Sequence, residues 1–264
     1  MSDRRMFMAD YIEAGTGPLV VLVHASMSGA RQWKSLMQAL DGRFRLRAIN
    51  LFGYGQTPAW SDQRPPTLED YGELVASAVP PDADGVTVIG HSFGGAVAME
   101  AARRLDARAA KLVLVEPSIF CLLAAGGRNE AHAEIAAVRD DMARLPPEAA
   151  AERFIGFWTG PESWAATPPE RQAAYVRGVE TVRGEFGAAF GSKTGLFEWG
   201  HALPKETLVI WAADTKRPSR EVVELLSLAG ASWKFARVPE GGHMSPLTHP
   251  ELVNPVIAAF LDGA

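Results

Sequence analysis

The sequence predicts an α/β fold: a mostly parallel, doubly wound sheet that is flanked by helices and carries an inserted helical cap. Short runs of branched apolar residues recur along the chain, and several are apolar almost throughout, as strands covered on both faces require. Between most of these runs lie stretches whose apolar residues repeat with the helical period. Strands that alternate with helices pair in parallel through right-handed crossovers, so this order favours a doubly wound sheet.

The apolar runs place the expected strands along the chain. They cover residues 19–23, 44–49, 86–90, 111–115, 207–212 and 233–238, with a further N-terminal strand over residues 6–13. Two early helices are predicted from apolar stripes. The stripes consist of Trp33, Leu36, Met37 and Leu40, and of Leu68, Tyr71, Leu74 and Val75. A capping box of Thr67 and Asp70 predicts where the second of these helices begins.

One connection is far longer than an ordinary crossover. About 90 residues separate the strand ending at Val115 from the strand beginning at Thr207, and long insertions of this kind tend to be functional lids. Helical stretches are expected within it over residues 129–143, 148–158 and 169–190. We therefore predict a core domain of residues 1–116 and 201–264 and a helical cap of residues 117–200. The alternative is a set of extra packing helices with no role in binding.

Composition and charge narrow the class of partner. The chain has 264 residues and a formal charge of −5, with no basic block that would attract nucleic acid. The single cysteine, Cys121, excludes an internal disulfide, and no secretory signal or membrane-length apolar run is present. We expect a cytoplasmic monomer or homodimer that acts on a neutral or weakly charged small molecule. No cofactor or metal is expected, because no metal-ligand or dinucleotide motif is present.

The segment Gly90-His-Ser-Phe-Gly-Gly95 carries the strongest chemical signal. It follows a buried-strand pattern and leads directly into a helical pattern, which is the context of a Gly-x-Ser-x-Gly nucleophile elbow. The sharp turn leaves no room for Cβ atoms beside Ser92, and glycines supply that space. Ser92 is therefore predicted to present its hydroxyl above the carboxyl edge of the sheet, at a helix N-terminus that favours negative charge.

A serine nucleophile needs a base and an acid that orients the base. His243 is the preferred base because it lies in a loop just after the strand over residues 233–238, whereas His249 is better explained as a helix-entry residue. Asp214, at the exit of the strand over residues 207–212, is the preferred acid because the order Ser, Asp, His is the one expected with this elbow. Glu116, at the exit of the strand over residues 111–115, is its rival.

Acyl transfer also needs backbone N–H donors for the oxyanion. The Phe93 N–H, immediately after the nucleophile, is one candidate. The second is expected from the loop after residues 19–23, from Ser26 or, alternatively, from Met27. His24 in the same loop is expected to be a buried, hydrogen-bonded residue that organises the loop.

These motifs together resemble the α/β-hydrolase superfamily, and specifically its lidded, cofactor-independent serine esterase-like branch. The resemblance rests on Val21-Leu-Val-His24, Asn50-Leu-Phe-Gly-Tyr-Gly55, Gly90-His-Ser-Phe-Gly-Gly95, Leu208-Val-Ile-Trp-Ala-Ala-Asp214 and Gly241-Gly-His243, in family order. It implies Ser92 as nucleophile, Asp214 and His243 as its partners, and the Ser26 and Phe93 amides as oxyanion donors. Two positions depart from the family pattern: Ala25 stands where the loop histidine is usually followed by Gly, and Trp211 where a Gly usually precedes the acid by three residues.

The expected cap is rich in aromatic side chains, some of which should line an apolar pocket. The predicted substrate-binding residues are Ile119, Phe120, Leu122, Phe157 and Trp158. At least half of the cap aromatics are expected to form the cap's own core instead.

The sequence thus predicts a serine hydrolase that cleaves carboxylic esters with an apolar acyl or aryl group through an acyl-enzyme. One alternative is hydrolysis of a carbon–carbon bond in a diketone-like substrate with the same triad. Another is a ligand sensor that keeps the fold and has little turnover, since a fold does not determine chemistry.

Overall fold

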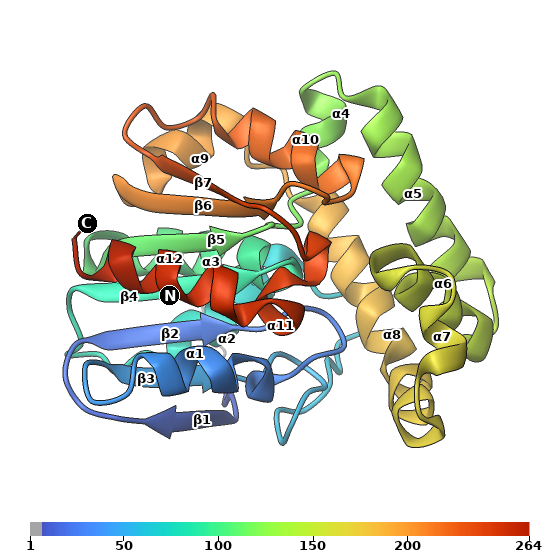
Figure 1. Cartoon of the computed structure of the whole chain (residues 1–264), viewed down its shortest axis with the longest axis horizontal. Helices are drawn as coiled ribbons and strands as arrows, with labels where there is room; N and C mark the ends of the chain where they lie inside the picture. The colour runs from blue at the N-terminus through green and yellow to red at the C-terminus, as the bar shows by residue number, and fades with distance from the viewer. Residues whose placement is uncertain (1–6, 264) are drawn as a thin grey trace.

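The computed structural model describes residues 7–263, which contain one central sheet (Figure 1). Its strands are β1 Tyr11–Ala14, β2 Leu19–Val23, β3 Arg45–Ile49, β4 Val86–His91, β5 Ala109–Val115, β6 Glu206–Ala212 and β7 Lys234–Val238. Their order is β1-β3-β2-β4-β5-β6-β7, with β1 antiparallel to β3 and the other pairs parallel. The predicted mostly parallel α/β sheet is therefore confirmed. The N-terminal strand is shorter than expected, and residue 6 of that prediction lies outside the described residues.

Helices cover both faces of the sheet, and the apolar strands pack against both layers. One face carries a 3-10 turn Ala30–Trp33, α1 Lys34–Ala39 and α12 Pro250–Leu261. The opposite face carries α2 Leu68–Ser77, α3 Phe93–Leu105 and α10 Arg217–Leu226. Strand β2 shows why its sequence has no polar position: alternate residues enter the two cores, and all are buried. The predicted capping box of Thr67 and Asp70 starts α2.

The long connection between β5 and β6 is helical. It contains α4 Cys121–Ala125, α5 Asn129–Arg144, α6 Pro147–Thr159, α7 Ser163–Ala166, α8 Pro169–Gly191 and α9 Leu196–Ala202. Helices α5 to α8 lie beyond the carboxyl ends of the parallel strands, whereas α9 lies beside α10 (Figure 1). The helices expected over residues 129–143, 148–158 and 169–190 correspond to α5, α6 and α8. The limits of the cap as a domain remain a prediction.

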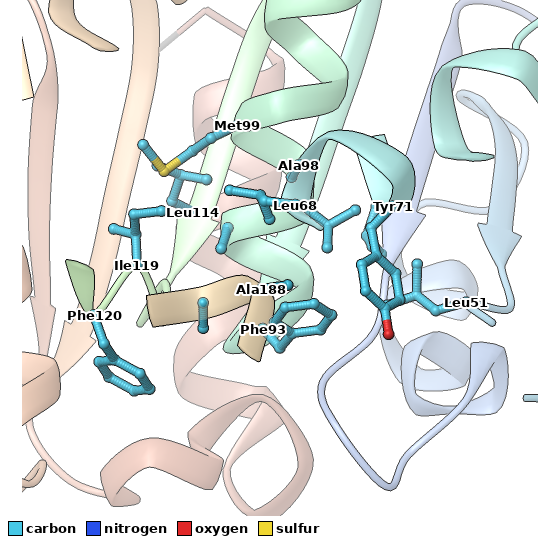
Figure 2. Close-up of a cluster of buried hydrophobic side chains, with 14 of the residues drawn as sticks. Leu51, Leu68, Tyr71, Phe93, Ala98, Met99, Leu114, Ile119, Phe120 and Ala188 are labelled. Atoms are coloured by element: carbon cyan, nitrogen blue, oxygen red, sulfur yellow. The ribbon is translucent and has the colours of Figure 1, made fainter. Parts of the chain in front are cut away.

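The core of the sheet continues into α8. Figure 2 shows Phe93 at the start of α3 near Tyr71 of α2, with Ala188 of α8 close to Phe93. All three residues belong to one buried apolar cluster. Helix α8 is therefore packed onto the region where the nucleophile elbow begins α3.

Candidate active site

Ser92 occupies a strained turn between β4 and α3. Its backbone has φ 56° and ψ −125°, a conformation that side-chain-bearing residues rarely adopt. The glycines on either side make the turn possible. A Cβ at Gly94 would lie 2.3 Å from the His24 carbonyl oxygen and 2.4 Å from that of Val23, and a Cβ at Gly90 would lie 2.2 Å from the Gly94 carbonyl oxygen. The sequence signal for a nucleophile elbow thus corresponds to a real steric requirement.

The structure brings Ser92 and His243 together although 151 positions separate them. The Ser92 Oγ lies 2.8 Å from His243 Nε2, so the hydroxyl can donate its proton to the ring. His243 is buried in the loop after β7, in a 3-10 turn, Gly242–Met244, that begins where Gly241 has a φ of 105°. A second hydroxyl, Ser118 Oγ, lies 3.2 Å from Ser92 Oγ.

The carboxylate next to His243 is Glu116, and the prediction of Asp214 as the acid must be corrected. His243 Nδ1 lies 2.8 Å from Glu116 Oε2, whereas Asp214 Oδ1 accepts a hydrogen bond of 2.8 Å from the Gly242 N–H. The sheet order explains the difference: Glu116 directly follows β5, which lies between β4 and β6. Glu116 therefore follows the strand next to β4, which leads into Ser92. Asp214 follows β6, one strand further away, and its carboxylate binds the loop that carries His243.

Glu116 is fixed by its own hydrogen bonds. Oε1 accepts from the Ala212 N–H at 2.9 Å, and Oε2 also accepts from the Thr215 hydroxyl. Ser219 Oγ lies 3.2 Å from His243 Nδ1, beside the Glu116 contact. A carboxylate held in this way favours a proton on Nδ1, which leaves Nε2 free to accept the proton of the serine.

Two further buried histidines hold the loops of the site. His91 Nε2 donates to the His243 carbonyl oxygen at 2.7 Å, and His91 Nδ1 lies 3.1 Å from Gln32 Nε2. Burial, with a smaller effect of His243, lowers the pKa of His91 to about 3. His24 organises its own loop, as expected: Nδ1 donates to the Ala25 carbonyl and Nε2 accepts from the Leu51 N–H. Burial lowers the pKa of His24 to about 4.

The sequence reasoning missed the role of His91, although its place beside the nucleophile gave a signal. Its side chain comes from the last residue of β4 and is fully buried. Because burial keeps it neutral, it can serve as a fixed hydrogen-bond donor to the loop that carries His243.

The candidate oxyanion donors differ in their availability. The Phe93 N–H is at the first position of α3, where an N–H has no partner within the helix. The Met27 N–H, by contrast, donates to the Tyr54 hydroxyl at 2.8 Å. Ser26 lines the same cavity as Ser92 and Phe93. Of the two candidates in this loop, Ser26 is therefore the one that we retain.

Ser92 lines two spaces, a small cavity of about 20 Å³ and a wide groove of about 820 Å³. The small cavity is bounded by the elbow and by residues of the long connection between β5 and β6. The small cavity is lined by Ser26, Ser92, Phe93, Ser118, Phe120, Phe154, Trp158, Val182, Glu185, Phe186 and Ala189. Ser92, Phe154 and Trp158 also line the groove, as does His243. The Trp158 ring stacks on the His243 ring at a centroid distance of 3.8 Å.

The predicted substrate-binding residues are only partly found at these spaces. Phe120 and Trp158 line the small cavity, while Ile119, Leu122 and Phe157 line neither space. Ile119 and Leu122 are buried in the apolar core instead, where Figure 2 shows Ile119 beside Leu114. The Phe157 ring packs edge-on against Trp158 at 4.7 Å. The sequence placed these side chains in the correct region but could not show which way each one faces.

Glu185 is a buried carboxyl on α8 that lines the small cavity, and no motif in the sequence indicates it. Burial raises its pKa to about 7, against the lowering effect of the Ser26 and Tyr54 hydroxyls.

Across residues 7–263, no group of His, Cys, Asp and Glu side chains is arranged to hold a metal ion. None of the helices in the same residues is both long and apolar enough to cross a membrane.

The chain is similar to known hydrolases over most of its length. The model of the alpha/beta hydrolase family matches residues 20–256, so the chain belongs to that family. The chain is 29% identical to a pimeloyl-(acyl-carrier protein) methyl ester esterase of Aromatoleum aromaticum, over 89% of this chain and 94% of the relative. It is 25% identical to a 2-hydroxy-6-oxo-6-(2'-aminophenyl)hexa-2,4-dienoic acid hydrolase of Metapseudomonas resinovorans, over 91% and 83%.

A solved structure confirms the fold over almost the whole chain. A thermophilic esterase from Thermogutta terrifontis superimposes with a TM-score of 0.71 at 24% identity, covering 97% of this chain and 93% of that one. The predicted α/β-hydrolase fold with esterase-like relatives is thereby confirmed.

Proposed function

We propose that this chain is a serine hydrolase that cleaves carboxylic esters with an apolar acyl or aryl group through an acyl-enzyme. The observation that carries the proposal is the continuous hydrogen-bonded chain from Ser92 Oγ through His243 to Glu116, with 2.8 Å at both contacts. Nucleophile, base and orienting acid are the three parts that activation of a serine requires. The family match and the esterase relative support the same class of reaction.

The geometry supports a reaction in two halves. Ser92 Oγ attacks the ester carbonyl carbon and its proton passes to His243 Nε2, while Glu116 stabilises the resulting imidazolium at Nδ1. The Phe93 and Ser26 N–H groups stabilise the oxyanion. The intermediate then collapses: the carbon–oxygen bond to the alcohol breaks, and His243 returns the proton to the leaving oxygen. Water repeats the sequence on the acyl-enzyme and releases the acid and free Ser92.

Hydrolysis of a carbon–carbon bond in a diketone-like substrate is the second candidate. It is favoured by the match to the dienoic acid hydrolase, which extends over 91% of this chain. The same three residues would serve it, with the proton going to carbon in place of oxygen. Faster turnover of a ring-cleavage product than of simple aryl esters would favour this candidate.

A panel of p-nitrophenyl esters tests the proposal. We expect wild-type turnover, and a fall in kcat of about five to six orders of magnitude on replacing Ser92 by Ala, to the level left by binding and the oxyanion donors. The matched control is Ser61→Ala, since Ser61 is exposed and lies outside the site. Undiminished turnover in Ser92→Ala contradicts the proposal. No turnover of any ester by the wild type would favour the sensor alternative.

A further inference from the structure

The two spaces at Ser92 differ in their access to the base. His243 lines the wide groove but not the small cavity, although Ser92 lines both. In the proposed reaction, on which this inference rests, the leaving oxygen must come within hydrogen-bonding reach of His243 Nε2. The alcohol part of an ester therefore lies in the groove. The acyl part, attached to the opposite side of the carbonyl carbon, extends into the small cavity.

Apart from Ser118, which contacts Ser92, the small cavity has one polar side chain that the triad and the oxyanion donors do not explain. Glu185 projects from α8 among aromatic neighbours such as Phe154 and Phe186, and its residue is only 1% exposed. Its Oε1 accepts a hydrogen bond of 2.9 Å from the Tyr54 hydroxyl. Its Oε2 is buried and forms no hydrogen bond of normal geometry with the described residues, although the Ser26 hydroxyl lies near enough to the carboxyl group to lower its pKa. A buried carboxyl oxygen without a donor is unfavourable by itself, and such groups are rare in folded proteins.

We propose that the small cavity binds the acyl part of the substrate, and that Glu185 Oε2 accepts a hydrogen bond from a hydroxyl or amino group on that part. The cavity of about 20 Å³ holds about one water, so the acyl part is short. The groove of about 820 Å³ leaves the alcohol part far less restricted. This narrows the proposed substrate: a large apolar or aryl group belongs on the alcohol side, and the acyl group is short and is selected by one polar contact.

A purely structural role for Glu185 makes a different prediction. Through Tyr54, Glu185 is linked to the Met27 N–H and so to the loop that carries Ser26. If holding this loop were its whole function, loss of the carboxylate would slow all esters by the same factor. The observable that separates the two roles is therefore the ratio of kcat/KM between two substrates.

The test uses methyl glycolate and methyl propanoate, in which a methyl group replaces the hydroxyl. After correction for their rates of alkaline hydrolysis, we expect wild-type kcat/KM to favour the hydroxy ester by about 10- to 100-fold. In Glu185→Gln, the amide oxygen can keep the Tyr54 contact while the NH₂ group replaces the accepting Oε2. The preference should then fall several-fold, because the NH₂ group can only donate a neutral hydrogen bond to the hydroxyl oxygen, which is weaker than a bond to a carboxylate. Glu170→Gln, an exposed position on the same helix, is the matched control and should keep it.

Two results would overturn the proposal. One is equal wild-type kcat/KM for both esters, and the other is a wild-type preference that survives undiminished in Glu185→Gln, as an equal loss for both esters would leave it. If the wild type hydrolyses neither these esters nor the p-nitrophenyl esters, the proposed function fails, and the subsite is then tested by calorimetric titration with glycolate and propanoate. Tighter binding of the hydroxy acid, lost in Glu185→Gln, supports the subsite. Equal binding, or none, contradicts it.

Discussion

Replacement of Glu116 by Gln should impair catalysis far more than replacement of Asp214 by Asn. In Glu116→Gln, the side-chain oxygen can still accept from the Ala212 N–H, which places the NH₂ group against His243 Nδ1. An NH₂ donor favours the tautomer with its proton on Nε2, and that ring cannot accept the proton of Ser92. The equivalent exchange in other serine triads lowers kcat by about 10⁴, so we expect a loss of about 10³ to 10⁴. This corresponds to about 4 to 5.5 kcal/mol of transition-state stabilisation.

The Asp214→Asn change gives the comparison. Asn can still accept the hydrogen bond that Asp214 receives from the Gly242 N–H, so only the charge is lost. We expect kcat to fall by less than about tenfold, in line with the modest net contribution of one hydrogen bond. The assay is hydrolysis of p-nitrophenyl acetate, with circular dichroism to show that both variants are folded. A large loss in Asp214→Asn together with an active Glu116→Gln would refute the assignment of Glu116.

Three other predictions concern the turn, the stacked ring and stability. Gly94→Ala should destabilise the protein by about 3 kcal/mol or more in urea unfolding, because its Cβ would meet carbonyl oxygens at 2.3–2.4 Å; a smaller loss contradicts the steric account of the elbow. Trp158→Leu should lower kcat/KM for p-nitrophenyl acetate about tenfold, since the indole stacks on the triad imidazole; unchanged kinetics would show that the stack is dispensable. Between pH 5 and 6, His24 and His91 are neutral in the folded protein, because their pKa values are lowered to about 4 and about 3, and each takes up a proton on unfolding. Glu185 is protonated in the folded protein, because its pKa is raised to about 7, and it releases a proton on unfolding. The net uptake of one proton means that the free energy of unfolding should rise by about 1.4 kcal/mol per pH unit, and urea titrations that show a flat or falling dependence would contradict these shifts.

The fold could be predicted because the apolar strand runs, the helical periods and the turn residues all indicate the same architecture. The fully apolar run at β2 required cover on both faces, and the structure provides it. The elbow was predictable for a local reason, since Gly90 and Gly94 stand where a Cβ would meet backbone atoms. Strand, turn and helix are contiguous in the chain, so their contacts can be inferred from order alone.

The acid was not predictable with the same certainty, because its position depends on which strands are neighbours. Both Glu116 and Asp214 follow apolar strands, and the expected order of triad residues favoured the latter. The adjacency of β4 and β5 decides for Glu116, and only the sheet order reveals it. The departure at Trp211, three residues before Asp214, was the one sequence signal against Asp214.

Side-chain direction in the cap was the other gap. Phe120 and Ile119 are consecutive in the chain, yet only Phe120 lines the small cavity, because successive side chains leave the backbone in different directions where the chain enters α4. Glu185 gave no signal at all, since a single Glu in a helix is ordinarily exposed. Its burial results from the packing of α8 over the elbow, a tertiary contact that no local pattern encodes.

The central claim is that Ser92 is made nucleophilic by His243, and a fluorophosphonate probe tests it most directly. The reagent forms a covalent bond with an activated serine oxygen, and peptide mass spectrometry identifies the residue that carries it. We predict one phosphonyl group per chain, on Ser92, and a labelling rate that falls at least 10³-fold in His243→Ala. Labelling elsewhere, no labelling, or an undiminished rate in His243→Ala would contradict the account.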